Sequence, residues 1–260
     1  GVQVLPVDVL HSDWHSTLEG EQGEQGEQGE QGEQGGLGGQ GAGLQPVRLG
    51  LDRLIGLAEA DAQRLLAARA ALAPGEVFAS VEDLARRAGL DAHALQLLAQ
   101  GDALRSLASH RYQAAWAVRG IDARATPLLQ ATRTHEPQVP LAAPGAGQAL
   151  LADYRSTGLS LVAHPLALLR QDLAAYKVQP AAVLALCRHG QLARASGLVT
   201  HRQRPETAKG VVFVTLEDET GAVNVIVWPA VAQAQRTPLL AATLLTVYGV
   251  WQRDSDRPDA

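Results

Sequence analysis

The sequence predicts an α+β chain of several domains, with a helical part followed by a β-rich part. Between residues 47 and 190, apolar residues recur at helical spacing and are bounded by capping residues, prolines and glycines. After Gly190 the apolar residues alternate with a period of two, which is typical of strands. A glycine-rich repeat near the N-terminus separates a short entry segment from the helical part.

The composition excludes several classes of protein. The 260 residues are 46% hydrophobic, which is enough for two or three small cores. One Cys excludes a disulfide scaffold and a multi-thiolate metal site. We find neither a signal peptide nor an apolar run long enough to cross a membrane, and therefore expect a cytoplasmic protein without a membrane partner. The sequence contains no Met, so we expect it to be a piece of a longer chain.

The net charge of −5 comes from one segment. Residues 20–34 read Gly-Glu-Gln five times over, and removing these five Glu from the 27 acidic residues leaves 22, which equals the number of Lys and Arg. We assign residues 19–46 to a solvated low-complexity insertion. Residues 1–18 form the entry segment, in which alternating residues predict a short strand that Pro6 interrupts.

Residues 47–120 are predicted to form a helical domain. Its helices are bounded by capping residues (Ser80 with Asp83, then Asp91) and by terminating glycines (Gly89, Gly101 and Gly120). Residues 121–147 contain four prolines and read as a linker. Residues 148–190 form a helical connector, with one helix over 148–158 and two that begin at Pro165 and Pro180 and run to about Tyr176 and to Gly190.

Residues 191–260 predict a β-barrel. We expect strands at 192–199, 211–216, 223–228 and 244–251, a tight turn at 219–221, and a helix at 229–237. Three strands, a helix and another strand is the order of an OB-fold, a five-stranded barrel. The sequence ends before a fifth strand, so we predict a truncated OB-fold.

The segment Leu54-Ile55-Gly56-Leu57-Ala58, with a helical run expected on each side, predicts a helix-hairpin-helix. Gly56 and Leu57 would let the backbone approach a phosphate, and nearby arginines would hold a duplex: Arg53 and Arg64, together with Arg48 and Arg69. Ala58 replaces the usual second glycine, and Glu59 and Asp61 would repel a phosphate. An ordinary helical hairpin is the alternative.

A second binding segment joins the first two expected strands of the barrel. Residues 200–210 occupy the position of the first nucleic-acid-binding loop of an OB-fold, and we predict that Arg202, Arg204 and Lys209 contact single-stranded phosphates. A solvated loop is the alternative. Phe213 and Trp228 would stack on bases if they faced outward, but we favour core positions because Phe213 lies within an apolar run.

Catalytic chemistry has little support in the residues. We interpret Glu217-Asp218-Glu219 as solvated turn acids rather than as a two-metal site. His11 and His15 could bind zinc on one helix face, but no third ligand is evident. We expect Cys187 to be a small packed residue of a helix, and His164 to stand at the start of a helix rather than to act as a base. We therefore predict no catalytic residue and no metal site.

The sequence resembles bacterial error-prone DNA polymerases, the translesion relatives of the polymerase III alpha subunit. In the OB-fold part the resemblance lies in residues 202–210, 215–221 and 224–229. Upstream it lies in Asp153-Tyr154, Thr157–Leu161, His164-Pro165, Pro6–Val9, Ser12–Trp14, Leu49–Leu51, Gly56-Leu57, Leu98–Leu107, Arg111 and Trp116. It covers nearly the whole chain except the repeat.

The resemblance implies a C-terminal fragment that grips primer-template duplex and single-stranded template in DNA repair, translesion synthesis and damage-induced mutagenesis. The catalytic aspartates and their Mg²⁺ would belong to a palm domain outside these residues, so the fragment would hold no cofactor and be inactive alone. Translesion accessory proteins and the sliding clamp are implied partners; Gln138–Leu141 resembles a clamp peptide that lacks its aromatic anchor. A stand-alone OB-fold module for single-stranded DNA or RNA and an interaction scaffold are the alternatives.

Overall fold

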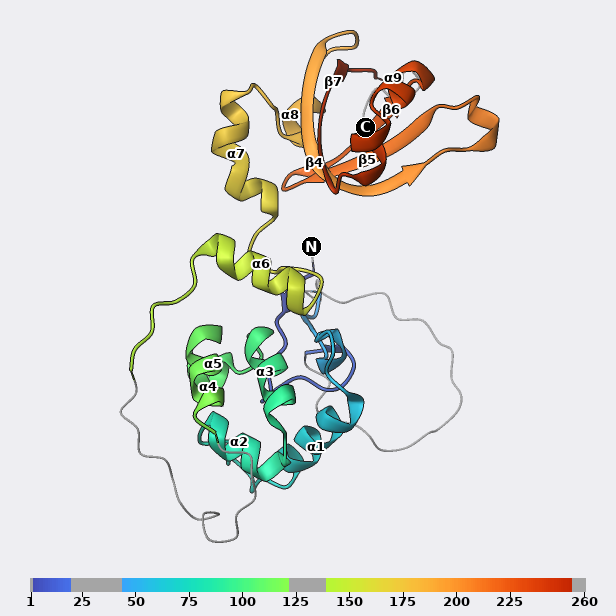
Figure 1. Ribbon diagram of the computed structural model, residues 1–260. Coiled ribbons are helices and arrows are strands. Elements are labelled where there is room, and N and C mark those ends of the chain that lie inside the picture. The colour runs from blue at the N-terminus through green and yellow to red at the C-terminus, as the bar shows by residue number, and fades with distance from the viewer. Residues whose placement is uncertain (1, 20–43, 122–138, 254–260) are drawn as a thin grey trace, which may run out of the picture. The chain divides into compact units, whose positions relative to one another are not determined.

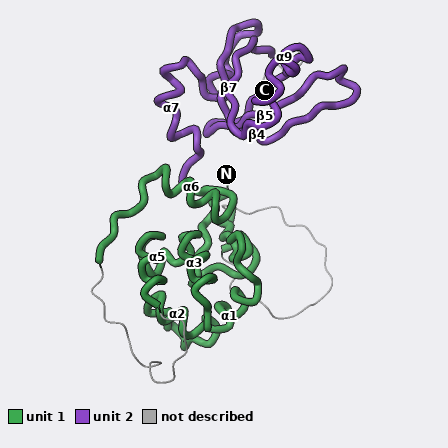
Figure 2. The backbone as a smooth tube through the Cα atoms, viewed as in Figure 1, with its two compact units in different colours: residues 1–161 green, residues 162–260 purple. Residues whose placement is uncertain are grey.

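The computed structural model describes residues 2–19, 44–121 and 139–253. The chain divides into two compact units, residues 1–161 and 162–260 (Figure 2). The division falls within the expected connector at 148–190. The Gly-Glu-Gln repeat, most of the expected linker at 121–147 and the last seven residues lie outside the described residues. None of the described helices is long and apolar enough to cross a membrane.

Unit 1 begins with a small sheet of three short strands. These are β1 (Val4–Leu5), β2 (Thr17–Leu18) and β3 (Val47–Arg48), in the order β1-β3-β2. β3 is parallel to β1 and antiparallel to β2. The single strand expected in residues 1–18 is therefore wrong: the segment supplies two strands, separated by the turn that follows Pro6.

Helices and the turns between them form most of the other described residues of unit 1 (Figure 1). They are the 3-10 turn η1 (Leu51–Arg53), α1 (Glu59–Ala70), α2 (Val81–Ala88), α3 (Ala92–Gln100), α4 (Arg105–Ala108), α5 (Arg111–Arg119) and α6 (Ala146–Ser156). They enclose one apolar core, whose largest fully buried side chains include Phe78, Leu84, Leu95, Leu98 and Leu104. Burial of these side chains is the main stabilising contribution to unit 1.

The expected helix ends of unit 1 are confirmed. Ser80 Oγ accepts a hydrogen bond from the Asp83 amide at 3.1 Å, and the Asp91 carboxylate accepts one from the Ala94 amide at 2.8 Å. The Asp83 carboxylate accepts from the amide of Ala79 rather than that of Ser80, so the capping box is shifted by one residue. Gly89 ends α2 in the left-handed conformation, with φ +59°.

Unit 2 contains a four-stranded antiparallel sheet flanked by helices (Figure 1). Its elements are α7 (Pro165–Ala175), α8 (Ala181–Leu184), β4 (Leu192–Gln203), the 3-10 turn η2 (Glu206–Ala208), β5 (Val212–Asp218), β6 (Gly221–Val227), α9 (Pro229–Ala234), α10 (Arg236–Ala241) and β7 (Leu244–Val250). The sheet order is β6-β5-β4-β7. The four expected strands and their order are confirmed.

Two helix predictions in unit 2 are wrong in detail. The helix expected from Pro180 to Gly190 is the single turn α8, after which the amides of Leu186 and Cys187 form i→i+3 bonds that tighten the chain into a turn. The helix expected at 229–237 is divided at Gln235 into α9 and α10. Pro238 accounts for this division, because a proline ring clashes with the carbonyl four residues earlier in a continuous helix.

Strand β4 holds the sheet together by pairing with two partners. Its residues 192–198 pair with β7. Its residues 198–203 pair with β5, and this pairing is irregular between Val199 and His201. Such an irregularity bends a strand and lets a sheet curve. At Gly197 a Cβ atom would lie only 2.7 Å from Leu216 Cβ, so the close approach of β4 and β5 requires glycine.

Candidate nucleic-acid interface

Alternation along β5 separates the core of unit 2 from an exposed face. Val212, Val214 and Leu216 are buried in the core, whereas Phe213 is 40% exposed on the opposite face. Phe213 pairs with Ile226 of β6, which is 44% exposed, and Trp228 directly after β6 is 59% exposed. The expectation that Phe213 and Trp228 are core residues is therefore wrong.

Uncharged polar side chains extend this exposed face. Thr215 Oγ1 donates a hydrogen bond to Asn224 Oδ1 across the β5–β6 pair at 3.0 Å. His201 and Gln203 of β4 pair with Thr215 and Phe213 and are exposed. We call the surface of Phe213, Thr215, Asn224, Ile226 and Trp228 the outer β5–β6 face. In an OB-fold, the corresponding face of the second and third strands binds oligonucleotides and oligosaccharides.

The loop between β4 and β5 places two cations beside this face. Arg204 and Lys209 are exposed, and no hydrogen bond or ion pair within the described residues engages either side chain. Lys209 and Gly210 both have positive φ, +48° and +87°. A Cβ atom on Gly210 would lie 3.6 Å from Pro229 Cγ and 3.8 Å from an Arg204 Nη atom. The Arg204 guanidinium therefore lies near the end of β6, where Trp228 precedes Pro229.

Arg202 occupies a different place from the other two predicted cations. It lies within β4 rather than in the loop, because β4 continues to Gln203 instead of ending at Val199. Its position pairs with the buried Val214, and its guanidinium donates a hydrogen bond to the carbonyl of Ala242 after α10. This bond joins β4 to the end of α10. Its predicted phosphate contact stays a prediction.

The acidic cluster at the β5–β6 turn is bound internally. The Arg170 guanidinium of α7 donates to Glu219 at 2.6 and 2.7 Å and to Asp218 at 3.2 Å. Asp218 is buried and also accepts from the amide of Ala181 at the start of α8. The interpretation of these residues as solvated turn acids is wrong for Asp218 and Glu219, which fasten α7 and α8 to the sheet.

This network changes the acidity of its carboxyl groups. Burial alone would raise the pKa of Asp218, but hydrogen bonds from Thr220 and Ala181 and the charge of Arg170 outweigh it and lower this pKa below its ordinary value. The hydrogen bond from Arg170 is the main cause that lowers the pKa of Glu219. Both groups are therefore carboxylates in neutral solution.

In unit 1 the hairpin at residues 54–58 has the expected turn but only one full helix. Gly56 has φ +90°, and Leu57 is buried in the core, where it anchors the turn. The helical run expected before Leu54 is wrong, because the single turn η1 follows directly on β3 and Gly50. The amide of Ile55 donates to the carbonyl of Ser156 at 2.8 Å, so the end of α6 lies against the hairpin.

The cations around the hairpin are mostly bound within the fold. Arg69 donates to the carbonyl of Ser12 and to the Asp13 carboxylate, each at 2.7 Å, and Arg48 pairs with Glu19. The remaining two predicted residues are exposed: Arg53, and Arg64, which pairs with Asp61 of the same helix. Glu59 and Asp61 in the first turn of α1 offset the positive charge there.

His164, His15 and Cys187, which the sequence analysis considered as candidate site residues, have structural roles. His164 Nδ1 accepts from the amide of Leu166 at 3.2 Å and caps α7, which confirms the expected helix entry. His15 pairs with Asp52 at 3.1 Å, and Cys187 packs beside the core that Ala181 and Leu184 form. Within the ranges that the structure describes, no three His, Cys, Asp or Glu side chains form a metal-binding group.

The fold and these surfaces define the chain as a nucleic-acid-binding region made of a helical hairpin unit and an OB-fold. Comparison with family models agrees. Residues 1–114 match a helix-hairpin-helix motif, and residues 194–259 match an OB-fold nucleic acid binding domain.

Curated relatives then identify the family. The chain is similar to error-prone DNA polymerases of Ralstonia nicotianae (48% identity over 96% of the chain), Bordetella parapertussis (47% over 97%) and Azoarcus sp. (48% over 98%). In each case it spans 22% of the relative's length. The chain belongs to the error-prone DNA polymerase family and comprises its helix-hairpin-helix and OB-fold region.

The sequence predictions missed three contributors to this interface, namely Thr215, Asn224 and Ile226. Ile226 completes the apolar part of the outer β5–β6 face beside Phe213. The alternation of Asn224 with Val223 and Val225 is the signal that places Ile226 on the same face as Asn224.

Proposed function

We propose that this region binds DNA for an error-prone polymerase acting in translesion synthesis, DNA repair and damage-induced mutagenesis. The OB-fold holds the single-stranded template on the outer β5–β6 face, and the helical unit contributes to gripping the primer-template duplex. The observation that carries the proposal is the exposed pair Phe213 and Trp228 beside the exposed cations Arg204 and Lys209.

The proposed binding mode follows from the chemistry of a single strand. Unpaired bases expose flat apolar faces that stack on aromatic side chains, and each such contact contributes about 1–3 kcal/mol. The phosphates attract Arg204 and Lys209, which hold the strand along the loop. Because stacking and phosphate contacts do not read base edges, we expect little sequence preference. A polymerase that copies variable templates requires this property.

The hairpin offers weaker evidence for duplex binding than the OB-fold offers for single-strand binding, because most cations near the hairpin are bound within the fold. The turn at Gly56 and Leu57 and the side chains of Arg53 and Arg64 are the candidates for phosphate contact. The pairing of Arg64 with Asp61 and the nearby Glu59 reduce the positive potential there. We therefore propose that the hairpin positions the duplex and that the OB-fold supplies most of the affinity of this chain.

The salt dependence of binding tests the OB-fold proposal. For a single strand, log K falls with log salt by about 0.7 for each phosphate that a protein neutralises. We expect Arg204→Gln with Lys209→Gln to reduce this slope by about 1.4, measured by fluorescence anisotropy on a labelled dT oligonucleotide. Arg188→Gln, an exposed arginine in the same unit, is the matched control.

This titration can refute the assignment of the loop, and a further variant extends it to Arg202. An unchanged slope in the double variant, or an equal loss in the control, would refute the assignment of the loop. Adding Arg202→Gln measures whether Arg202 also contacts phosphate; its hydrogen bond to Ala242 makes it the weakest of the three candidates.

The whole protein's chemistry and partners are also proposals. By family resemblance, we propose that nucleotidyl transfer uses Mg²⁺ held by carboxylates of a palm domain elsewhere in the longer protein, and that the sliding clamp and translesion accessory proteins are partners. In the proposed clamp peptide at residues 138–141, Gln138 lies outside the described residues, and the described residues give this proposal no support. The Leu141 amide donates to Gln113 at 3.2 Å, and its carbonyl lies 3.1 Å from His110 Nε2, so this residue is bound to α5.

Two alternative functions were a stand-alone OB-fold module that binds single-stranded DNA or RNA and an interaction scaffold. Similarity to the polymerases spans both units rather than the OB-fold alone, which argues against a stand-alone OB-fold module. A scaffold role is tested by a pull-down with the sliding clamp or an accessory polymerase, set beside the DNA titration above. Binding of such a protein without any binding of DNA would favour the scaffold.

A further inference from the structure

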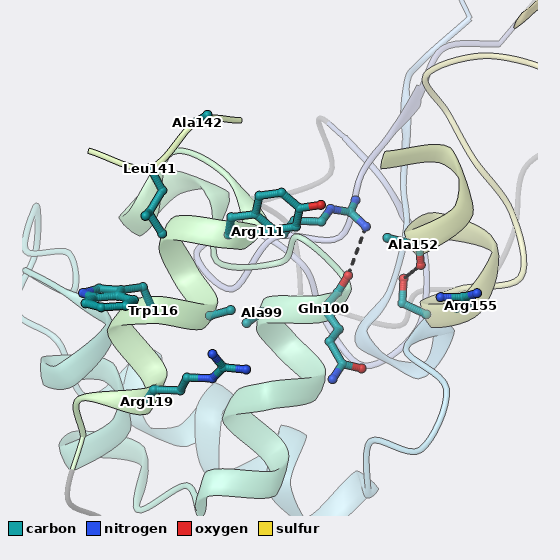
Figure 3. A pocket seen from close by; sticks show the side chains of 12 residues that line it. Ala99, Gln100, Arg111, Trp116, Arg119, Leu141, Ala142, Ala152 and Arg155 are labelled. Carbon is teal, nitrogen blue, oxygen red and sulfur yellow. Dashed lines mark hydrogen bonds between the residues drawn. The ribbon is translucent and has the colours of Figure 1, made fainter. Parts of the chain in front are cut away.

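A pocket of about 700 Å³ opens in unit 1, far in the sequence from the OB-fold (Figure 3). Its lining comes from the end of α3, the exposed side of α5, the end of α6 and the segment at residues 141–142. We call it the α5–α6 pocket. Its volume lies in the range of roughly 300–1,000 Å³ that is typical of sites for small organic ligands.

The shape of the pocket suits a flat ring. Tyr112 and Trp116 lie one turn apart on α5 and are 39% and 49% exposed. Three small side chains, those of Ala99, Ala115 and Ala152, contribute to the lining and leave room between the helices. Leu141 forms one side and is held in place by its backbone bonds to α5. An aromatic base therefore has a stacking partner and space beside it.

The charge of the pocket favours an anion. Arg119 and Arg155 are exposed at its lining, and no hydrogen bond or ion pair within the described residues engages either guanidinium. Arg111, also in the lining, is bound by Asp153 and donates to the Gln100 carbonyl at 3.2 Å. The described lining contains no Asp or Glu. Arg119 and Arg155 thus bring two exposed positive charges to a pocket that an exposed tryptophan also lines.

We propose that the α5–α6 pocket binds a second stretch of single-stranded DNA, with a base stacked on Trp116 and flanking phosphates on Arg119 and Arg155. The exposed side chain of Gln100 supplies an amide toward base edges (Figure 3). The proposal rests on the nucleic-acid-binding function proposed above and adds a site in the helical unit. An acidic peptide would match the positive charge of the pocket. A peptide of Asp and Glu has no flat ring to stack on Trp116, whereas a DNA base has one.

The direct test is photochemical cross-linking of the chain to a dT oligonucleotide that carries 5-bromodeoxyuridine, followed by peptide mapping. It is run on the chain itself and on a variant with a silenced OB-fold (Arg204→Gln, Lys209→Gln, Phe213→Ala and Trp228→Ala). We expect a cross-link at Trp116 or Tyr112 in both proteins. Arg119→Gln with Arg155→Gln should abolish it, and Arg188→Gln should leave it unchanged.

Affinity measurements on the silenced variant give a second readout. Trp116→Ala should weaken oligonucleotide binding by at least about fivefold, and the exposed Tyr176→Ala should not. Arg119→Gln with Arg155→Gln keeps the aromatic side chains and should reduce the salt slope by about 1.4. Circular dichroism verifies that each variant is folded.

The outcomes separate this inference from the proposed function. Cross-links confined to residues 194–259 would overturn the second site and support the OB-fold site. Cross-links nowhere in the chain would overturn both. A polyglutamate peptide that binds the silenced variant through Arg119 and Arg155, while the oligonucleotide does not, would also overturn the proposal in favour of a protein partner.

Discussion

The buried carboxylate of Asp218 accepts hydrogen bonds from both α7 and α8 and so helps to attach them to the sheet. Its carboxylate accepts from the amide of Ala181 at 2.8 Å, from Arg170 at 3.2 Å, from the amide and hydroxyl of Thr220 at 2.7 Å each, and from the amide of Gly221 at 3.1 Å. Asp218→Asn keeps the shape of this side chain, removes its charge and replaces one acceptor oxygen with a donor.

The structure sets the size of the expected loss. Whichever way the amide turns, at least two donors face an NH₂ group instead of an oxygen, and the side chain of Asp218 is only 3% exposed. A buried donor left without an acceptor costs about 1–3 kcal/mol. We therefore expect Asp218→Asn to lower the free energy of unfolding of unit 2 by about 2–4 kcal/mol at pH 7.

The pH dependence follows from the lowered pKa of Asp218. A group whose pKa is lower in the folded state stabilises the fold above its unfolded pKa and loses this contribution as pH falls through its folded pKa. The ordinary value for this group is 3.8. The difference between the chain and Asp218→Asn should therefore be complete at pH 7 and shrink below about pH 4.

Urea unfolding followed by tryptophan fluorescence measures this loss. Trp228 and Trp251 lie in unit 2, so a background with Trp14→Phe and Trp116→Phe reports on that unit alone. Glu217→Gln is the matched control, because this neighbouring carboxylate is exposed. A loss below about 0.5 kcal/mol in Asp218→Asn, or an equal loss in the control, would refute the reasoning.

Two further predictions concern close packing and helix capping. Gly197→Ala would place a Cβ atom 2.7 Å from Leu216 Cβ and 2.8 Å from the Glu217 amide nitrogen, so it should destabilise unit 2 by about 1–3 kcal/mol in the same urea assay; unaltered stability would contradict the close approach of β4 and β5. Ser80→Ala removes the cap of α2 and should cost unit 1 about 0.5–2 kcal/mol, read from the fluorescence of Trp14 and Trp116; Ser80→Asp, which keeps an acceptor, should lose much less.

The parts of the fold that depend on neighbouring residues could be predicted from the sequence. Helix ends at Ser80, Gly89 and Asp91 depend on side chains and backbone angles within a single turn. The strands of the OB-fold follow from local alternation. The length of β4 did not follow, because a strand continues where a partner is present, and residues 200–203 find that partner in β5.

The candidate site depends more on contacts between distant residues. The carbonyl that accepts from Arg202 belongs to Ala242, forty positions later, and no local pattern indicates this bond. Phe213 was misplaced because Val211, Val212 and Val214 around it are all apolar, which hides the alternation that its exposure reveals. The α5–α6 pocket joins three helices and a loop, and only the tertiary structure brings them together.

The central claim is that the outer β5–β6 face binds single-stranded DNA by stacking. The most direct measurement is the dissociation constant of Phe213→Ala with Trp228→Ala for a dT oligonucleotide, beside the exposed control Tyr176→Ala. Two lost stacking contacts, at about 1 kcal/mol or more each, predict binding at least about 30-fold weaker, with the control unchanged. An unchanged dissociation constant in the folded double variant would contradict the claim.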